Sequence, residues 1–160
     1  SKDLKQEDQK YVICSGGGPG IMMAANRGAS EAGGKNAAFR ISLPLENIHN
    51  PYVTQELDFE FHYFFTRKFW FAYLAKALII MPGGFGTLDE FFEILTLIQT
   101  EKIKKRLPIV LFGKEFWNKL INFKTLVEFG TIDKKDLNLF FLTSNVDEAY
   151  EFVTSSLTQK

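Results

Sequence analysis

The stretch PGGFGTLDE, residues 82–90, directly follows the apolar run ALIIM at residues 77–81. A short apolar run is typical of a buried strand, and TLDEFFEILTLIQTEKI at residues 87–103 has the periodicity of an amphipathic helix. The glycines therefore fall between a strand and a helix, where unpaired backbone N–H groups favour an anion. This pattern predicts an α/β fold with a phosphate-sized site at the glycine loop.

The same alternation of strand and helix patterns runs along the whole chain. We predict strands at residues 11–15, 37–43, 58–64, 77–81, 107–113 and 139–143. The apolar runs at residues 11–15 and 77–81 are expected to be buried strands. We predict helices at residues 21–33, 66–76, 87–103, 115–130 and 145–157, and a loop at residues 44–57. Apolar strands that alternate with helices predict a doubly wound, Rossmann-like parallel sheet with helices on both faces. A single nucleotide-binding domain spanning residues 1–160 accounts for the length, since no repeat or linker interrupts it.

The composition excludes several classes of protein. Lys and Arg number 19, as do Asp and Glu, so the charge gives no reason to expect nucleic acid or an anionic membrane as a partner. No apolar stretch reaches the length of about 18 residues that suggests a transmembrane helix, and the polar residues 1–10 do not resemble a signal peptide. The single cysteine, Cys14, excludes an internal disulfide and is predicted to be buried and unreactive. We expect a reducing, cytoplasmic location, and no metal site, because His49 and His62 have no ligand partner at useful spacing.

A second glycine loop, SGGGPG at residues 15–20, lies between the predicted strand 11–15 and the predicted helix 21–33. It is not the dinucleotide fingerprint, because Ile21 occupies the third glycine position, and PGGFGT is not a Walker A loop, because no Lys-Ser/Thr follows. Both loops nevertheless let backbone amides approach an anion at the carboxyl edge of the predicted sheet. The candidate phosphate ligands are Gly16, Gly17, Gly18, Gly83, Gly84, Gly86 and Thr87. The alternative for either loop alone is a tight strand-to-helix turn.

The charged candidates also have two interpretations each. TLDE matches a capping box, in which Thr87 caps the helix and Glu90 reaches back to the Thr87 amide. A carboxylate fixed at a helix N-terminus beside a phosphate loop also stays ionised and can act in catalysis. Arg67 and Lys68 are either surface charges or anion ligands, since basic residues are mildly unfavourable at a helix N-terminus that holds no anion.

Three segments together resemble the Lonely Guy (LOG) family of cytokinin riboside 5'-monophosphate phosphoribohydrolases. They are SGGGPGIMMAANRGASEAGG, FHYFFTRK and PGGFGTLDEFFEILTLIQT, and the last meets every fixed position of the family pattern PGGxGTxxE. The resemblance, from Tyr11 to the C-terminus, implies Arg67 and Glu90 as catalytic residues, with Lys68, Thr87 and the glycine loops at the nucleotide. It also implies a further strand and helix before Tyr11, so we expect the natural protein to be longer at its N-terminus. A homodimer or larger homo-oligomer is expected, because helix 66–76 is rich in aromatic residues and the family's subunits meet near the active site.

The resemblance implies hydrolysis of the N-glycosidic bond of a purine nucleoside 5'-monophosphate, such as AMP or N6-modified AMP, to free base and ribose 5-phosphate. Met22, Phe64 and Phe85 are candidates for the slot that holds the base. Proteins with this motif are often labelled possible lysine decarboxylases. Pyridoxal phosphate needs a lysine that forms a Schiff base and a partner for its ring nitrogen, and the sequence shows no recognisable set of these residues. No cofactor is expected. The alternatives are a nucleotide-binding or carrier protein without turnover, and a structural domain whose glycine loops bind nothing.

Overall fold

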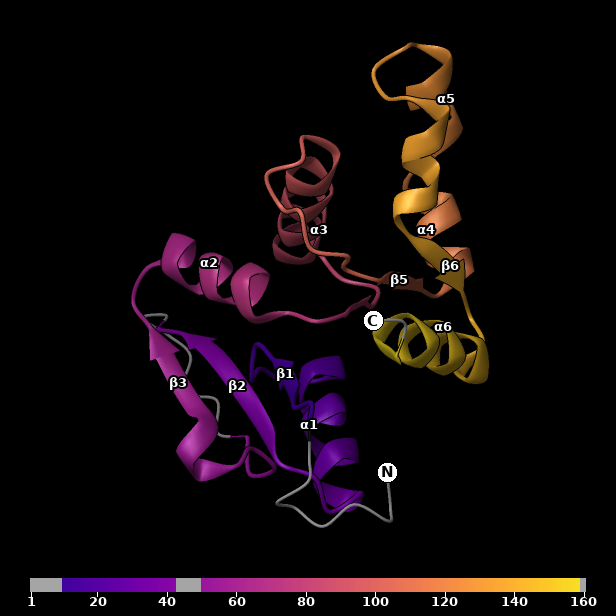
Figure 1. Ribbon diagram of the computed structural model, residues 1–160. Coiled ribbons are helices and arrows are strands. Elements are labelled where there is room, and N and C mark those ends of the chain that lie inside the picture. Colours follow the sequence, from indigo (N-terminus) through magenta and orange to yellow (C-terminus); the bar gives the residue numbers. More distant parts are fainter. Residues whose placement is uncertain (1–9, 43–49, 159–160) are drawn as a thin grey trace. The chain divides into compact units, whose positions relative to one another are not determined.

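The computed structural model describes residues 10–42 and 50–158, so His49 and the start of the predicted loop 44–57 lie outside the described residues. The chain divides into two compact units, Ser1–Tyr73 and Leu74–Lys160, and each is described by itself. Figure 1 shows strands and helices alternating along both. The first unit contains β1 (Ile13–Ser15), α1 (Ile21–Glu31), β2 (Asn36–Ile41), the 3-10 helix η2 (Gln55–Leu57), β3 (Asp58–Phe61) and α2 (Phe64–Leu74), whose last residue belongs to the second unit. The second contains β4 (Leu78–Ile80), α3 (Phe85–Gln99), β5 (Ile109–Phe112), α4 (Lys114–Leu120), α5 (Phe123–Glu128), η3 (Lys134–Leu139), β6 (Phe141–Thr143) and α6 (Val146–Thr158).

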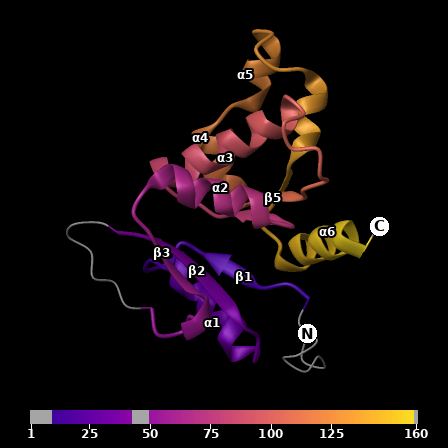
Figure 2. The same ribbon diagram turned by 60° about the vertical axis from the view of Figure 1, so that its left-hand side comes forward.

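The first unit is a three-stranded parallel sheet in the order β1-β2-β3, covered by a helix on each face (Figures 1 and 2). Successive side chains of β2 point to opposite faces, as in any strand. Asn36 faces α1, where its amide oxygen accepts a hydrogen bond of 2.8 Å from Asn26. Phe39 faces α2, and its ring centroid lies 5.0 Å from that of Phe71. The double covering confirms the predicted Rossmann-like α/β class.

The prediction that strand 11–15 is buried is wrong. Among the residues that the structure describes, β1 is an end strand of its sheet, and Ile13 is 49% exposed. Cys14 is also exposed as a residue, yet enough protein surrounds its sulfur that desolvation raises the pKa of the thiol to about 12. The exposure contradicts the predicted burial of Cys14, whereas the raised pKa agrees with the predicted low reactivity.

The second unit is built around a parallel sheet in the order β4-β5-β6. The central strand is fully buried at Ile109, Val110 and Leu111. Two consecutive residues show that both faces are covered: the ring centroid of Phe140 lies 5.9 Å from that of Phe91 in α3, and the ring of Phe141 stacks at 4.8 Å on Phe152 in α6. β4 is an end strand like β1, and Ile79 is 47% exposed, so the predicted burial of strand 77–81 also fails in part.

The predicted helix 115–130 is two helices. α4 ends at Leu120, and the Asn122 side chain caps α5 by accepting a hydrogen bond from the Thr125 amide. An asparagine side chain competes with the helical backbone in this way, which interrupts an otherwise continuous amphipathic pattern.

The two tryptophans have different surroundings. Trp117 of α4 is fully buried against Phe91, whereas Trp70 of α2 in the first unit is 41% exposed.

The two glycine loops belong to different sheets. Each follows a strand and precedes a helix, as predicted, but loop 15–20 follows β1 of the first sheet and loop 82–86 follows β4 of the second. The strand pairing therefore differs from the predicted single sheet. Because all pairs are parallel, each loop still lies at the carboxyl edge of its own sheet, where α/β folds bind ligands. The single domain remains a prediction.

Candidate functional site: two glycine loops at sheet edges

The loop at residues 82–86 contains glycines of two kinds. A side chain at Gly83 would overlap the hydroxyl and the β-carbon of Thr87 in the first turn of α3, so this glycine is required by packing within the chain. A Cβ atom at Gly84 or Gly86 would meet nothing within 4 Å. The backbone of Gly84, with φ −89°, is also accessible to other residues. Neither packing nor Gly84's backbone angle explains these two glycines, and the space beside them is open.

The helix after this loop begins earlier than predicted. α3 starts at Phe85 with Gly84 as its N-cap and without a side-chain capping hydrogen bond, and the first helical bond runs from the Leu88 amide to the Gly84 carbonyl at 3.1 Å. Thr87 therefore lies inside the helix, and the predicted capping box is wrong. Glu90 lies in the second turn of α3 and is half-buried. The capping explanation for Glu90 is thereby removed.

The loop at residues 15–20 is shaped by its neighbours. Gly20, the N-cap of α1, has φ 69° and ψ −125°, which side chains rarely adopt, and α1 has no side-chain cap. Cβ atoms at Gly16 and Gly18 would lie 2.8 Å and 2.5 Å from the Met22 side chain, so that side chain lies directly over the loop. Met22 is thus beside the loop, as its proposed role at the base requires.

Gly17 differs from its neighbours. Its φ is 73°, and a Cβ atom there would lie 2.7 Å from Cγ of Arg40, so the residue rests on β2. Its N–H donates to the Ser15 hydroxyl at 3.0 Å. Within residues 10–42 and 50–158, no hydrogen bond from the Gly16 or Gly18 N–H is present. The loop therefore turns one amide inward and leaves the other two as candidate donors for an anion.

Arg67 and Lys68 lie in the first turns of α2, which follows β3. The guanidinium carbon of Arg67 lies 5.4 Å from the ring centroid of Phe64 and 5.9 Å from that of Phe71, so both aromatic rings restrict the side chain. Since β1 and β3 are both parallel to β2, the first glycine loop and the start of α2 lie at the same edge of the first sheet. Gly83, Gly84, Gly86, Thr87 and Glu90 lie at the corresponding edge of the second sheet.

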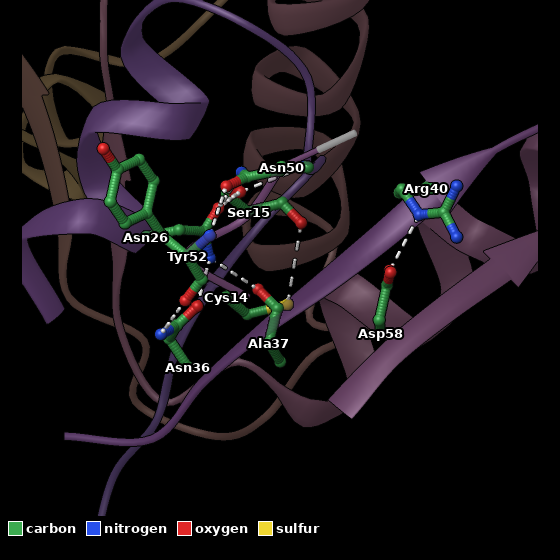
Figure 3. Close-up of polar contacts among 10 residues, drawn as sticks. Cys14, Ser15, Asn26, Asn36, Ala37, Arg40, Asn50, Tyr52 and Asp58 are labelled. Carbon is green, nitrogen blue, oxygen red and sulfur yellow. Dashed lines mark hydrogen bonds and ion pairs between the residues drawn. The ribbon is translucent and has the colours of Figure 1, made fainter. Parts of the chain in front are cut away.

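Sequence reasoning missed a buried polar cluster beneath the first loop. Ser15, Asn26, Asn36 and Asn50 are joined by side-chain hydrogen bonds, and the three asparagines are at most 7% exposed (Figure 3). The available signal was Asn26, an amide on the sheet-facing side of an amphipathic helix, where an apolar residue is expected.

Two cavities in the described residues are lined entirely by residues outside both glycine loops. A cavity of about 550 Å³ in the first unit lies at the opposite edge of the sheet from loop 15–20, beside the turn that ends α1. It is lined by residues that include Gly33, Asn36, Tyr52 and Glu56. A second cavity, of about 480 Å³, lies at the carboxyl edge of the second sheet beside Gly113 and Ser144. The glycine loops are better suited to an anion than the larger cavity, because helix N-termini and open glycines offer defined donors.

Within the described ranges 10–42 and 50–158, the chain has neither a candidate membrane-spanning helix nor a candidate metal cluster. None of the helices there is both long and apolar enough to cross a membrane. The same residues contain no group of three or more His, Cys, Asp or Glu side chains placed to hold a metal ion.

The fold and the two loops define a Rossmann-like α/β protein with candidate anion sites at the ends of β1 and β4. A family model described as possible lysine decarboxylase matches residues 22–153, and the chain belongs to that family. Among curated proteins, the chain is similar to a probable cytokinin riboside 5'-monophosphate phosphoribohydrolase, LOG4, of Oryza sativa subsp. japonica. The two are 35% identical over 92 residues, which cover 56% of this chain and 39% of the relative. The resemblance to the LOG family is thereby confirmed.

Proposed function

We propose that the protein hydrolyses the N-glycosidic bond of a purine nucleoside 5'-monophosphate, releasing the base and ribose 5-phosphate. The observation that carries the proposal is the arrangement of residues at the start of α3. The space beside Gly84 and Gly86 is open. Thr87 lies in the first turn of the helix, and the half-buried Glu90 lies about one turn after it. An uncapped helix N-terminus attracts a dianionic phosphate, and a nearby carboxylate suits the cationic sugar that forms as the bond breaks.

The proposed reaction balances with water as the only co-reactant. The bond between C1' of the ribose and the base nitrogen breaks, the electron pair leaves with the base, and the oxygen of water bonds to C1'. One proton of the water finally resides on the base. Glu90 stabilises the positive charge on the sugar or accepts a proton from the attacking water, whereas phosphate binding positions the sugar from a distance. Arg67 is the second proposed catalytic residue, holding phosphate or ribose oxygens, as the family resemblance implies.

Two properties of the relatives support this proposal over the decarboxylase description. The rice relative is named as a probable cytokinin riboside 5'-monophosphate phosphoribohydrolase. The family description names lysine decarboxylation only as possible. The match covers 39% of that relative. The activity of this chain is therefore a proposal, which the following experiment tests.

The decisive experiment incubates the full chain with AMP, with N6-isopentenyl AMP and with adenosine, and follows free base and ribose 5-phosphate by chromatography. Release of base from either monophosphate, but not from adenosine, is the expected result. Binding of AMP without release of base would favour the alternative, a nucleotide-binding or carrier protein. Comparing the two monophosphates determines whether an N6 substituent is preferred.

A further inference from the structure

The Asn26 side chain is the centre of a buried hydrogen-bond network (Figure 3). Asn26 is 0% exposed, and both the oxygen and the nitrogen of its side-chain amide form hydrogen bonds. Its Oδ1 accepts hydrogen bonds from the Ser15 hydroxyl at 2.6 Å and from Nδ2 of Asn50 at 3.0 Å. Its Nδ2 donates to Oδ1 of Asn36 at 2.8 Å and to the Ala37 carbonyl at 3.1 Å. A backbone carbonyl can only accept, so Ala37 fixes which end of the Asn26 amide faces Ser15.

Ser15 transmits this orientation to the first glycine loop. A hydroxyl has one hydrogen to donate, and Ser15 gives it to Asn26. The remaining lone pairs are then available to the Gly17 N–H, which donates to the Ser15 oxygen at 3.0 Å. The chain from Ala37 through Asn26 and Ser15 therefore determines the direction of the Gly17 amide.

The orientation of Gly17 in turn constrains the other two glycines. With its N–H directed into the protein and its α-carbon packed on the stem of Arg40, Gly17 is fixed at the centre of the loop. Gly16 and Gly18 are its direct neighbours in the chain, so a fixed Gly17 restricts the directions in which their amides can point. We propose that Ser15 and Asn26 are positioning residues of the nucleotide site: they do not touch the ligand, and they orient the Gly16 and Gly18 amides toward its phosphate. This inference rests on the proposed function, because it takes the phosphate of a nucleoside monophosphate as the ligand.

A merely structural role would predict something different. The network also joins α1 to β2 and to the segment before β3, since Nδ2 of Asn36 donates to the Tyr52 carbonyl at 2.9 Å. Any broken bond in the network will therefore lower stability. Asn50 supplies the matched control, because it donates to the same Asn26 oxygen as Ser15 does, it is 7% exposed, and no hydrogen bond joins it to the loop in the described chain.

The test compares Ser15→Ala and Asn50→Ala in the full chain by calorimetric titration with AMP and adenosine and by thermal unfolding. Both variants lose one hydrogen bond to Asn26, so both should unfold at a lower temperature. Only Ser15→Ala should weaken AMP binding, by about tenfold, because one or more phosphate donors lose their orientation. Adenosine, which has no phosphate, should bind both variants equally. Ser15→Thr keeps the hydroxyl and should restore AMP affinity; Ser15→Cys fills the same space if the alanine variant does not fold, and should also weaken AMP binding.

Three outcomes separate this inference from the proposed function. Equal loss of AMP affinity in Ser15→Ala and Asn50→Ala, or no loss in Ser15→Ala, would overturn the positioning role. Tight AMP binding by the wild-type protein without release of base would overturn hydrolysis alone. Wild-type binding of AMP no tighter than that of adenosine would overturn both, since no phosphate site would then exist.

Discussion

Thr87 occupies the space that a side chain on Gly83 would need. A Cβ atom at Gly83 would overlap the hydroxyl and the β-carbon of Thr87, and rotation about χ1 does not move the β-carbon, so it cannot relieve the contact. The neighbouring Gly84 has open space around it and an ordinary backbone angle. Packing against Thr87 therefore explains Gly83 but not the adjacent Gly84, and substitution by alanine should distinguish the two.

We expect Gly83→Ala to destabilise the protein by about 1–3 kcal/mol, the usual cost of forcing extra atoms into a packed site. Gly84→Ala should change the free energy of unfolding by less than about 0.5 kcal/mol. Urea unfolding of both variants measures the difference. Equal destabilisation would show that packing against Thr87 does not explain Gly83.

Binding of the nucleotide should depend on its 5'-phosphate. AMP should bind far more tightly than adenosine, because loss of the dianion leaves the loop donors unpaired. Gly84→Val should weaken AMP binding more than Phe85→Leu, since the valine enters the space proposed for the anion, whereas Phe85 is 91% exposed. Calorimetry of the wild-type protein and of both variants with both ligands gives the six affinities. Similar affinities of the wild-type protein for AMP and adenosine would refute the phosphate site.

Release of base should require Glu90 and Arg67. Glu90→Gln and Arg67→Ala should each lower the rate by about 100-fold or more, as expected for groups that act on the transition state. Glu93→Gln is the matched control, an exposed carboxylate on the same helix. Circular dichroism establishes that each variant is folded. Full activity of Glu90→Gln would eliminate the proposed role of the carboxylate.

The second unit should lose stability in acid through Asp136. Hydrogen bonds from the Gln99 side chain and from the Asp133 backbone lower the pKa of Asp136. The folded state then binds the proton less readily than the unfolded chain, so the stabilisation is complete above the ordinary aspartate pKa of about 3.9 and is lost as pH falls through the lower folded value. Urea unfolding at pH 5.5, 4 and 3 should show a weaker acid dependence in Gln99→Leu. An unchanged dependence would contradict this assignment.

The protein should form a homodimer or a larger homo-oligomer. Phe69, Trp70 and Tyr73 of α2 are 57%, 41% and 64% exposed, and no residue of this helix is fully buried. Aromatic side chains gathered on one exposed helix are typical of interaction surfaces. We expect light scattering at micromolar concentration to give at least twice the monomer mass, and Phe69→Arg to shift the population toward monomer. A wild-type monomer would contradict the prediction.

The sequence predicted the order of the elements well, because apolar periodicity and glycine positions are local signals. It did not predict where side chains compete with the backbone: Asn122 divides one predicted helix, and the capping box occurs at Asp133 and Asp136 instead of at Thr87. It also missed the exposure of Ile13, since whether a strand lies at the end of a sheet depends on pairing between distant segments.

The candidate site was predictable in part, for a similar reason. Glycine loops before helices are recognisable along the chain, and so is the motif that contains Glu90. The contacts of Asn26 were not recognisable, because Ser15, Asn36 and Asn50 approach it from separate segments. Which glycines are held by packing also depends on side chains, such as Thr87 and Arg40, that only the folded chain brings near.

Each of the two units contains one tryptophan, so fluorescence can report on the folding of each unit separately. Of the two tryptophans, the half-exposed Trp70 lies in the first unit and the fully buried Trp117 in the second. Their fluorescence should therefore differ in colour, with emission from Trp117 at shorter wavelength than that from Trp70. Trp70→Phe and Trp117→Phe would each leave a single emitter. Melting followed through one emitter at a time would reveal whether the two units unfold as one cooperative body or in succession.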